Sequence, residues 1–408
     1  MDCYFDNNAT TMVPERVVKA ICKWFNTGNP SAQYKSAVIS QEMIMSTRQL
    51  IAKTFSFSLD DYYVIFNSGA SEGNCSVLLS AARAYKKITG KVPHFVVSSV
   101  EHKSLLNCID DLVSDKLITV TRLPAAYRSI TPAELEAAIQ PNTALISIMA
   151  ANNETGILNN LAPLTDIAHK HNIPFHSDSV QITGKMDFSI RRNGLDAVTL
   201  SFHKFHGPVG LGLCIIRKDF ISGYKMCPVI CGTQNYALRG GTENVPLIAG
   251  AYEAMRYTFY GTHTLGDVCD YVAGMRNYIV EELSKRFKCF YISQYGTAPS
   301  NAAIELAGPK NPVLYLITTK DFVGTLPNTI LIAVYKPKVC NAALRAGMEA
   351  RGVIIGIGSA CDKSSESHVV RALKVPELLR PGMLRISLSS ENTKAECKKL
   401  IEVFTQIV

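Results

Sequence analysis

Long runs of one residue class are missing from this sequence, and their absence excludes several kinds of protein. The formal net charge is +8 and the isoelectric point is about 8.8, yet the basic residues are scattered and no five are consecutive. Direct binding to nucleic acid is therefore not expected. No segment approaches about eighteen uninterrupted apolar residues, and residues 1–6 lack a basic region followed by an apolar core. We expect a soluble, cytoplasmic protein without membrane contact.

Dense cysteine spacing and complete metal-ligand motifs are also absent. Twelve cysteines are spread along the chain, so in a reducing compartment most should be buried thiols rather than a disulfide framework. Cys227 and Cys231 are close in sequence, as are His203 and His206, but neither pair is followed by a second pair at finger-like spacing. The sequence therefore predicts no metal site.

The length of 408 residues exceeds that of one ordinary hydrophobic core. We predict a short N-terminal segment at residues 1–15 that packs near a smaller domain. A large α/β domain should occupy residues 16–250, and the smaller α+β domain residues 251–408. Several glycine and proline residues between Tyr295 and Pro327 predict an exposed insertion there.

Short apolar segments alternate with helical patterns through the large domain. The predicted strands are 62–66, 94–98, 144–149, 173–176 and 197–202, with 212–217 as an added antiparallel or edge strand. The predicted helices between them are 74–85, 104–112, 132–139 and 162–171. This alternation is typical of a doubly wound, mostly parallel sheet. The smaller domain should contain strands at 302–306 and 329–334 and a final helix at 394–406.

Lys204 lies where one of these apolar strands must stop. Val198, Leu200 and Phe202 alternate as in a buried strand, and a Gly-Pro break follows shortly after Lys204. In open α/β sheets ligands bind at the carboxyl edge, and a lysine partly removed from water becomes a usable amine nucleophile. Lys204 is therefore a candidate covalent anchor for a cofactor. A solvated loop lysine is the alternative.

Distinctive polar groups follow the other strands at the same edge. The segment 67–74 is a glycine-containing turn before a helix, where backbone N–H groups and the helix N-terminus can bind phosphate. A plain turn with an N-capped helix is the alternative. The next three strands are followed by His102, Asn153 and Asp178. We expect these residues and Lys204 to converge on one edge of one sheet.

The side chains at this edge have complementary chemical uses. An imidazole can stack on a planar ring, an amide can donate to a phenolate-like oxygen, and a carboxylate can hold a pyridinium nitrogen protonated. Pyridoxal 5′-phosphate (PLP) held on a lysine needs all three. Asp178 would keep the ring cationic, which makes the cofactor an electron sink.

Several short motifs occur in a fixed order almost from end to end. They are Tyr4-Phe-Asp-Asn-Asn-Ala-Thr-Thr11, Gly28-Asn-Pro-Ser31, Glu101-His-Lys103, Asn152-Asn-Glu-Thr-Gly156, the Lys204 segment, Arg239-Gly-Gly-Thr-Glu-Asn244, Gly358-Ser-Ala-Cys361 and Leu384-Arg-Ile-Ser-Leu388. With these motifs in this order, the chain resembles the NifS/IscS-like cysteine desulfurases, which belong to the class V aminotransferase group of PLP enzymes.

The resemblance implies a homodimer of PLP fold type I that acts on L-cysteine. Lys204 would hold the cofactor through a Schiff base, and His102 would stack on its ring. The other cofactor contacts would be Asn153 and Gln181 at the ring oxygen, Asp178 at the ring nitrogen, and Ala70, Ser71, Ser201 and His203 at the phosphate. Thr242 would reach the phosphate of the neighbouring subunit. Arg385 would pair with the substrate carboxylate, and Asn153 would also contact the substrate.

Cys361 resembles the sulfur-accepting cysteine of this family. It lies in the small, polar segment 356–368. Its thiolate could attack the sulfur of bound cysteine and leave a persulfide and alanine. A buried structural thiol is the alternative. The resemblance further implies a sulfur-acceptor protein, either an iron–sulfur scaffold or a thiolation protein.

Some positions depart from the family's usual residues. Ser71 replaces a threonine, Phe202 a small residue, Tyr34 a histidine, and Ser389-Ser390 a Gly-Arg pair. Two other functions are therefore considered. One is a related PLP-dependent lyase or aminotransferase, such as a selenocysteine lyase, in which Cys361 is incidental. The other is a catalytically impaired dimeric binding module of the same fold.

Overall fold

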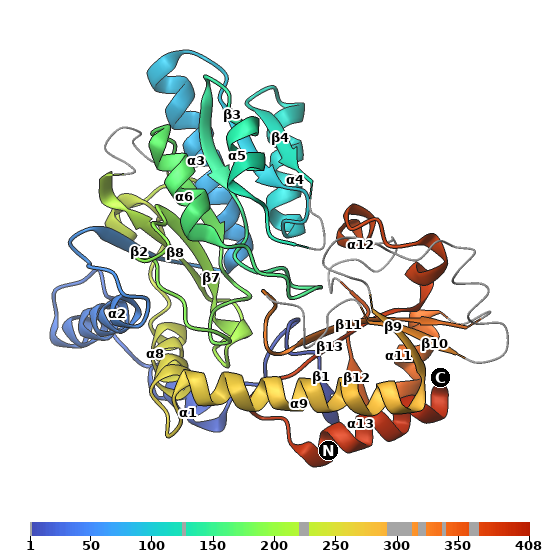
Figure 1. Ribbon diagram of the computed structural model, residues 1–408. Helices are drawn as coiled ribbons and strands as arrows, with labels where there is room; N and C mark the ends of the chain where they lie inside the picture. The colour runs from blue at the N-terminus through green and yellow to red at the C-terminus, as the bar shows by residue number, and fades with distance from the viewer. Residues whose placement is uncertain are drawn as a thin grey trace.

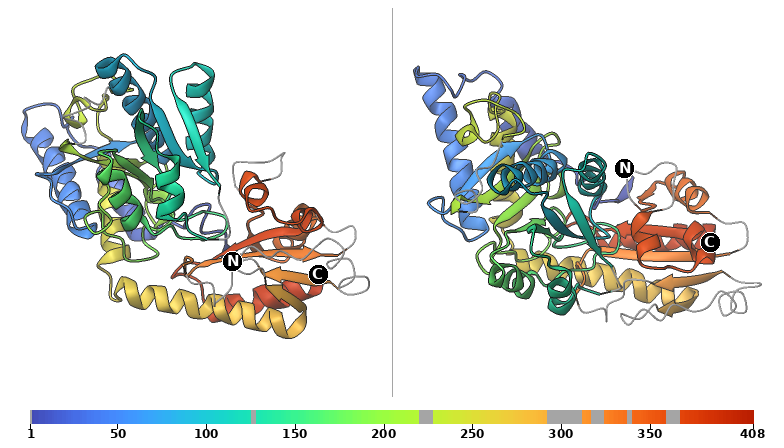
Figure 2. Two further views of the ribbon diagram at one scale, coloured as in Figure 1. Left: turned by 45° about the horizontal axis from the view of Figure 1, so that its top comes forward. Right: turned by 90° about the horizontal axis from the view of Figure 1, so that it is seen from above.

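The computed structural model describes residues 2–124, 128–219, 228–291, 312–316, 324–336, 340–358 and 367–408. A larger part is built on a seven-stranded sheet and a smaller part on a four-stranded sheet (Figure 1). Helix α9 (Leu265–Arg286) extends from the base of the larger part along the smaller one. Both termini lie at the smaller part, as the further views in Figure 2 also show.

The larger sheet confirms the prediction of a mostly parallel arrangement. Its strands, in spatial order, are β2 (Tyr62–Asn67), β8 (Gly212–Arg217), β7 (Ala197–Ser201), β6 (Phe175–Asp178), β5 (Thr143–Ser147), β3 (His94–Ser98) and β4 (Thr119–Leu123). Among these described strands only β8 runs antiparallel to its neighbours. β8 was expected to be antiparallel or at an edge; it is antiparallel but lies inside the sheet, between β2 and β7.

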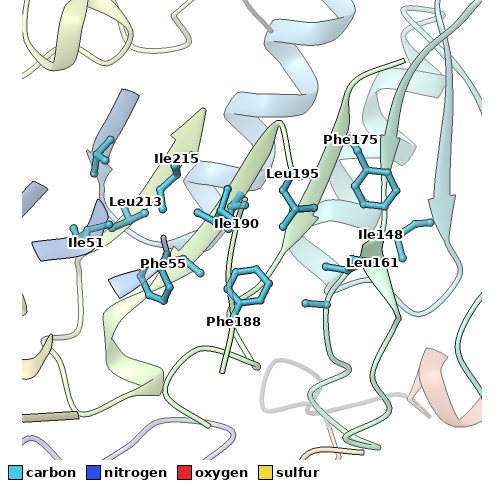
Figure 3. Packing of buried hydrophobic residues seen from close by; sticks show 14 of the residues in the cluster. Ile51, Phe55, Ile148, Leu161, Phe175, Phe188, Ile190, Leu195, Leu213 and Ile215 are labelled. Carbon is cyan, nitrogen blue, oxygen red and sulfur yellow. The ribbon is translucent and has the colours of Figure 1, made fainter. Parts of the chain in front are cut away.

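Helices cover both faces of this sheet, as expected for a doubly wound fold. One face packs against α2 (Lys35–Thr54), α5 (Pro132–Ala138), α6 (Leu161–Lys170) and α8 (Val245–Phe259), and the other against α3 (Ala70–Thr89) and α4 (Lys103–Ser114). Val64 and Phe66 of β2 belong to the first core and Ile65 to the second, because successive strand side chains point to opposite faces. Figure 3 shows Ile51 of α2 in the same layer as Leu213 of β8. Helix α1 (Glu15–Lys23) packs on α8.

The smaller sheet has the N-terminal segment beside it. Its strands, in spatial order, are β13 (Met383–Ser387), β11 (Thr329–Tyr335), β10 (Val313–Leu316) and β9 (Lys288–Tyr291). Helices α9, α11 (Asn341–Glu349) and α13 (Lys394–Ile407) share one core with it, and α12 (His368–Ala372) packs in another. β1 (Cys3–Phe5) pairs with β12 (Val353–Ile355), and Asp6 then bridges to Ser387. Residues 6–11 consequently pass between the two parts.

Three sequence predictions are wrong or incomplete. The short apolar run Val313–Leu316 was placed in an exposed insertion, but it is β10, buried and paired on both sides. β4 was not predicted, because it is an edge strand in which only Leu123 is buried. Most cysteines were expected to be buried. Of the ten whose surroundings are described, all are free thiols and only Cys3, Cys108, Cys214 and Cys397 are buried. The predicted strand 302–306 and most of the insertion lie outside the described residues.

Two features of the described ranges concern membranes and metals. None of the helices within them combines the length and the apolar character that crossing a membrane requires. In the same ranges no three His, Cys, Asp or Glu side chains gather in a way that could hold a metal ion.

The buried ring of His176 predicts how stability depends on pH. His176 lies in β6, where its Nδ1 is 2.8 Å from Ser147 Oγ and its Nε2 is 2.9 Å from Thr199 Oγ1. Burial lowers the pKa of His176 to about 3. Below about pH 6.5 the unfolded chain therefore binds a proton that the folded protein does not. The stability that the neutral ring supports is complete above that pH and is lost as the pH falls toward 3.

We expect the free energy of unfolding, measured by urea denaturation between about pH 4 and 7, to decrease with falling pH. In His176→Asn the slope should be less steep by up to about 1.4 kcal/mol per pH unit, because the titrating ring is gone. His263→Asn changes an exposed ring and should keep the wild-type slope. Equal slopes in all three proteins would contradict this account.

Candidate active site

A cavity of about 430 Å³ lies where the parallel strands of the larger sheet end. Because the carboxyl ends of parallel strands meet at one edge, residues far apart in sequence line this cavity together. Of the twelve candidate site residues, those that line it are Ala70, Ser71, His102, Asn153, Asp178, Gln181, Ser201, His203, Lys204 and Arg385. Thr242 does not line the cavity, and Cys361 lies outside the described residues.

One end of the cavity is suited to an anion. Helix α3 begins at Ala70, directly after Gly69, and no side chain caps it, so first-turn N–H groups remain available. Gly69 has φ +154°, a backbone conformation that L side chains rarely adopt. Ser201 and His203 line the same cavity. Burial and the nearby Lys204 charge lower the pKa of His203 to about 4, so its ring is neutral at pH 7.

Asp178 presents a fixed carboxylate to the cavity. It is the last residue of β6, and its Oδ1 accepts from Val180 N at 3.1 Å. Its Oδ2 accepts from Asn74 Nδ2 at 2.8 Å. Asn74 is fully buried, and its Oδ1 has no hydrogen-bond partner in the described chain. These two contacts hold the carboxylate in a defined orientation.

The ring of His102 is held by the helix that it begins. His102 is the N-cap of α4, and its Nδ1 accepts from Ser104 N at 3.2 Å, with Ser104 Oγ 2.8 Å away. Because Nδ1 accepts, the proton of the neutral ring belongs on Nε2. Burial lowers the pKa of His102, against the opposing effect of Asp178. At neutral pH the ring is thus an uncharged donor at the cavity wall.

Lys204 lines another side of the cavity. β7 ends at Ser201, and a short 3₁₀ turn at Phe202–Lys204 places the lysine at the sheet edge, as predicted. Its Nζ donates to the backbone oxygens of Asn8 at 2.9 Å and Ala9 at 2.6 Å. The N-terminal segment thereby forms part of the wall that holds this amine.

Arg385 reaches the same cavity from the smaller sheet. It is only 1% exposed, and its outer nitrogen donates to Asp6 Oδ1 at 2.6 Å. A second nitrogen donates to the Asn153 backbone oxygen at 3.0 Å. Its Nε is buried without a partner among the described residues. Asp6 offsets the charge and fixes the plane of the guanidinium group.

Sequence reasoning missed the residue that joins these parts, Asn8. It is 1% exposed, and every polar atom is hydrogen-bonded. Its partners are Ser387 Oγ, Asn153 O, Thr329 Oγ1, Asn328 Nδ2, Gln181 Nε2, Lys185 Nζ and Lys204 Nζ. The 4–11 motif singled out this stretch but assigned no role within it. Lys185, a buried lysine four residues after Gln181, was missed as well.

Thr242 lies on the exposed surface of this chain. Its segment is fastened by two ion pairs, Arg239 to Glu72 at 2.8 Å and Glu243 to Arg48 at 2.9 Å. Both pairs hold the segment against the larger part. The threonine therefore faces outward from this chain and not into its cavity.

The residues that flank the Cys361 segment both lie near Glu154, the neighbour of Asn153. Ser367 Oγ donates to Glu154 Oε2 at 2.7 Å. A Cβ built on Gly358 would lie 3.5 Å from the same oxygen. The described ends of the segment are thus adjacent to the cavity wall.

Among the departures from the family's usual residues, Ser71 lines the cavity and the others fall outside it. Phe202 is 1% exposed and packs in the core, with its ring 5.3 Å from that of Phe205. Tyr34 lies on the surface. Ser389 and Ser390 line a second cavity, of about 300 Å³, that lies against Lys204.

Comparison with known proteins agrees with this arrangement. A family model described as aminotransferase class-V matches residues 3–307. The chain belongs to the aminotransferase class-V family. A cysteine desulfurase of Cereibacter sphaeroides is 31% identical over 99% of this chain and 95% of its own length. Among solved structures, a NifS-like protein has a TM-score of 0.83 at 28% identity and covers 100% of this chain and 99% of its own. A structure titled SspA in complex with cysteine has a TM-score of 0.75 at 26% identity, covering 96% and 100%.

The hydrogen bonds of Asn8 predict that replacing this residue strongly lowers the stability of this class-V protein. Asn8→Ala would remove one hydrogen bond from each of four buried or half-buried groups: Lys185 Nζ, Asn328 Nδ2, Asn153 O and Thr329 Oγ1. We expect the free energy of unfolding, measured in urea, to fall by about 3 kcal/mol. Asn26→Ala, at an exposed position, should change it by less than about 0.5 kcal/mol. Similar effects of the two substitutions would contradict the role assigned to Asn8.

Proposed function

We propose that this chain is a PLP-dependent cysteine desulfurase, which converts L-cysteine to L-alanine and retains the sulfur as a persulfide on Cys361. The observation that carries the proposal is the convergence of Lys204, Asp178, His102 and Arg385 on one cavity. Relatives named cysteine desulfurase align over nearly the whole chain, which supports the same conclusion.

The cavity suits PLP in three respects. The uncapped N-terminus of α3 can hold a phosphate. Asp178, fixed by Asn74, can hold a ring nitrogen protonated. Lys204 supplies the amine for covalent attachment. Arg385 lines the cavity, and its buried Nε lacks a partner in the described chain, as expected for a group at a site that takes a polar ligand.

The protein's own residues divide the work on the substrate. When bound, PLP supplies an electron sink that stabilises negative charge at the substrate's α-carbon. Arg385, held in plane by Asp6, binds the substrate carboxylate through its remaining donors. Lys204 removes and returns the α-proton, since its amine lies at the cavity wall. The neutral ring of His102 carries its own proton on Nε2, and it can donate this Nε2 proton to the reacting substrate.

Cys361 would complete the reaction. Its thiolate attacks the substrate's sulfur, so that a sulfur–sulfur bond forms while the carbon–sulfur bond of the substrate breaks. A proton then takes the place of sulfur on the carbon. The overall change, L-cysteine plus thiol to L-alanine plus persulfide, is balanced without an external oxidant. An iron–sulfur scaffold or a thiolation protein would take the persulfide sulfur.

A homodimer is part of the proposal. Exposed apolar side chains occur on α1, α2 and the 229–236 segment; they include Val18, Val38, Ile39, Met45, Val229, Ile230 and Tyr236. In the proposed dimer these side chains belong to the surface that the second subunit would cover. Val209, 68% exposed, lies at the cavity itself. A second subunit covering this side would bring its Thr242 near the phosphate end.

The proposal predicts which substitutions separate cofactor binding from sulfur transfer. The purified PLP-loaded protein, incubated with L-cysteine, should release alanine and carry a persulfide detectable by mass spectrometry. Cys361→Ala should keep the absorbance of bound cofactor but form no persulfide, with alanine release under reducing conditions at least about a hundredfold lower. Cys340→Ala, at a different cysteine, which is exposed in the structure, should behave as wild type.

Other outcomes would favour the alternatives. Absence of both alanine and persulfide with PLP bound would contradict the proposal and favour a binding module. Activity on selenocysteine that survives Cys361→Ala, without activity on cysteine, would favour a selenocysteine lyase. Sedimentation of the same sample should give twice the chain mass of 44.7 kDa, and a monomer would contradict the dimer.

A further inference from the structure

Lys185 is a buried lysine whose described contacts include no carboxylate. It is 9% exposed, and its Nζ donates to Asn8 Oδ1 at 2.8 Å and to Gln181 Oε1 at 2.6 Å. Both acceptors are neutral amide oxygens. A buried ammonium group normally requires an ion-pair partner, so this environment is unusual for a lysine.

The surroundings favour the neutral amine. Burial lowers the pKa of Lys185 well below its usual value, and the nearby charges of Lys204 and Arg385 lower it further. A neutral amine carries two hydrogens, and the structure supplies two acceptors for them. In this state Lys185 is a pair of donors without net charge, which burial tolerates.

These two donors determine which way the Gln181 amide faces. Its two ends have nearly the same shape, so only their partners can distinguish them. Lys185 takes the oxygen end, and Gln181 Nε2 donates one hydrogen to the Asn8 backbone oxygen at 3.1 Å. Gln181 also lines the 430 Å³ cavity. Its second amide hydrogen is the one left to serve a ligand there.

We propose that Lys185 is a positioning residue, which holds the NH₂ group of Gln181 toward the cofactor cavity and so provides a donor for an anionic oxygen of the bound ligand. This inference rests on the proposed function, because the oxygen belongs to PLP. Without Lys185, the amide could turn and present an acceptor, which would repel such an oxygen. Lys185 thus acts through Gln181 and not on the substrate itself.

The test uses the PLP-loaded protein without cysteine, so that its readout is independent of turnover. The absorbance of bound cofactor is titrated against pH for wild type, Lys185→Met, Gln181→Ala and the double variant, and PLP affinity is measured for each. We expect Lys185→Met to move the midpoint by at least about half a pH unit and to weaken PLP binding about tenfold, or about 1.4 kcal/mol. The double variant should have the same titration midpoint and the same PLP affinity as Gln181→Ala alone, because Lys185 acts only through Gln181.

Two controls separate positioning from a structural role. Lys170→Met, at a surface lysine paired with Glu136, should keep the wild-type midpoint. If Lys185→Met does not fold, Lys185→Leu, which also removes both donors, should show the same direction of shift. The inference would be overturned if a folded Lys185 variant had lowered thermal stability but kept the wild-type midpoint of the absorbance titration. It would also be overturned if the midpoint shifts of the two single variants added up in the double variant. A wild-type protein that binds no PLP would instead contradict the proposed function.

Discussion

The hydrogen bonding of Asn8 is the interaction on which the site depends. Its backbone oxygen accepts from Lys204 and Gln181 of the larger part. Its side chain joins Lys185 and Asn153 to residues near the smaller sheet, Asn328 and Thr329. A buried amide has two donors and two acceptor positions, and here all of them have partners. Because a half-satisfied buried network is costly, these contacts favour one relative placement of the elements they join.

That placement decides how charge is distributed around the cavity. Burial lowers the pKa of Lys185, and the charges of Lys204 and Arg385 lie close enough to lower it further. Asp6 pairs with Arg385, while Lys185 is surrounded by neutral amides. The balance is suited to an anionic ligand such as a phosphorylated cofactor with a carboxylate substrate. It also explains why the N-terminal segment, far from Lys204 in sequence, forms part of the site.

Much of this architecture could be predicted from the sequence, for identifiable reasons. The central strands were recognisable because they are apolar on both faces, and Lys204 because a Gly-Pro break follows its strand. β4 was missed because an edge strand shows little apolar pattern, and β10 because four residues between glycine and proline segments carry too little signal. Asn8 and Lys185 could not be assigned roles, since their importance lies in contacts between distant segments. Cys361 was identified through resemblance alone, and it lies outside the described residues.

The central claim is that the cavity at the strand ends holds PLP covalently on Lys204, with Lys185 beside it as an uncharged donor. The most direct measurement is borohydride reduction of the PLP-loaded protein followed by peptide mapping. Reduction fixes the cofactor to the lysine that carries it. The account predicts a pyridoxyl group on Lys204 and none on Lys185. Labelling of Lys185, or of any other lysine in place of Lys204, would contradict it.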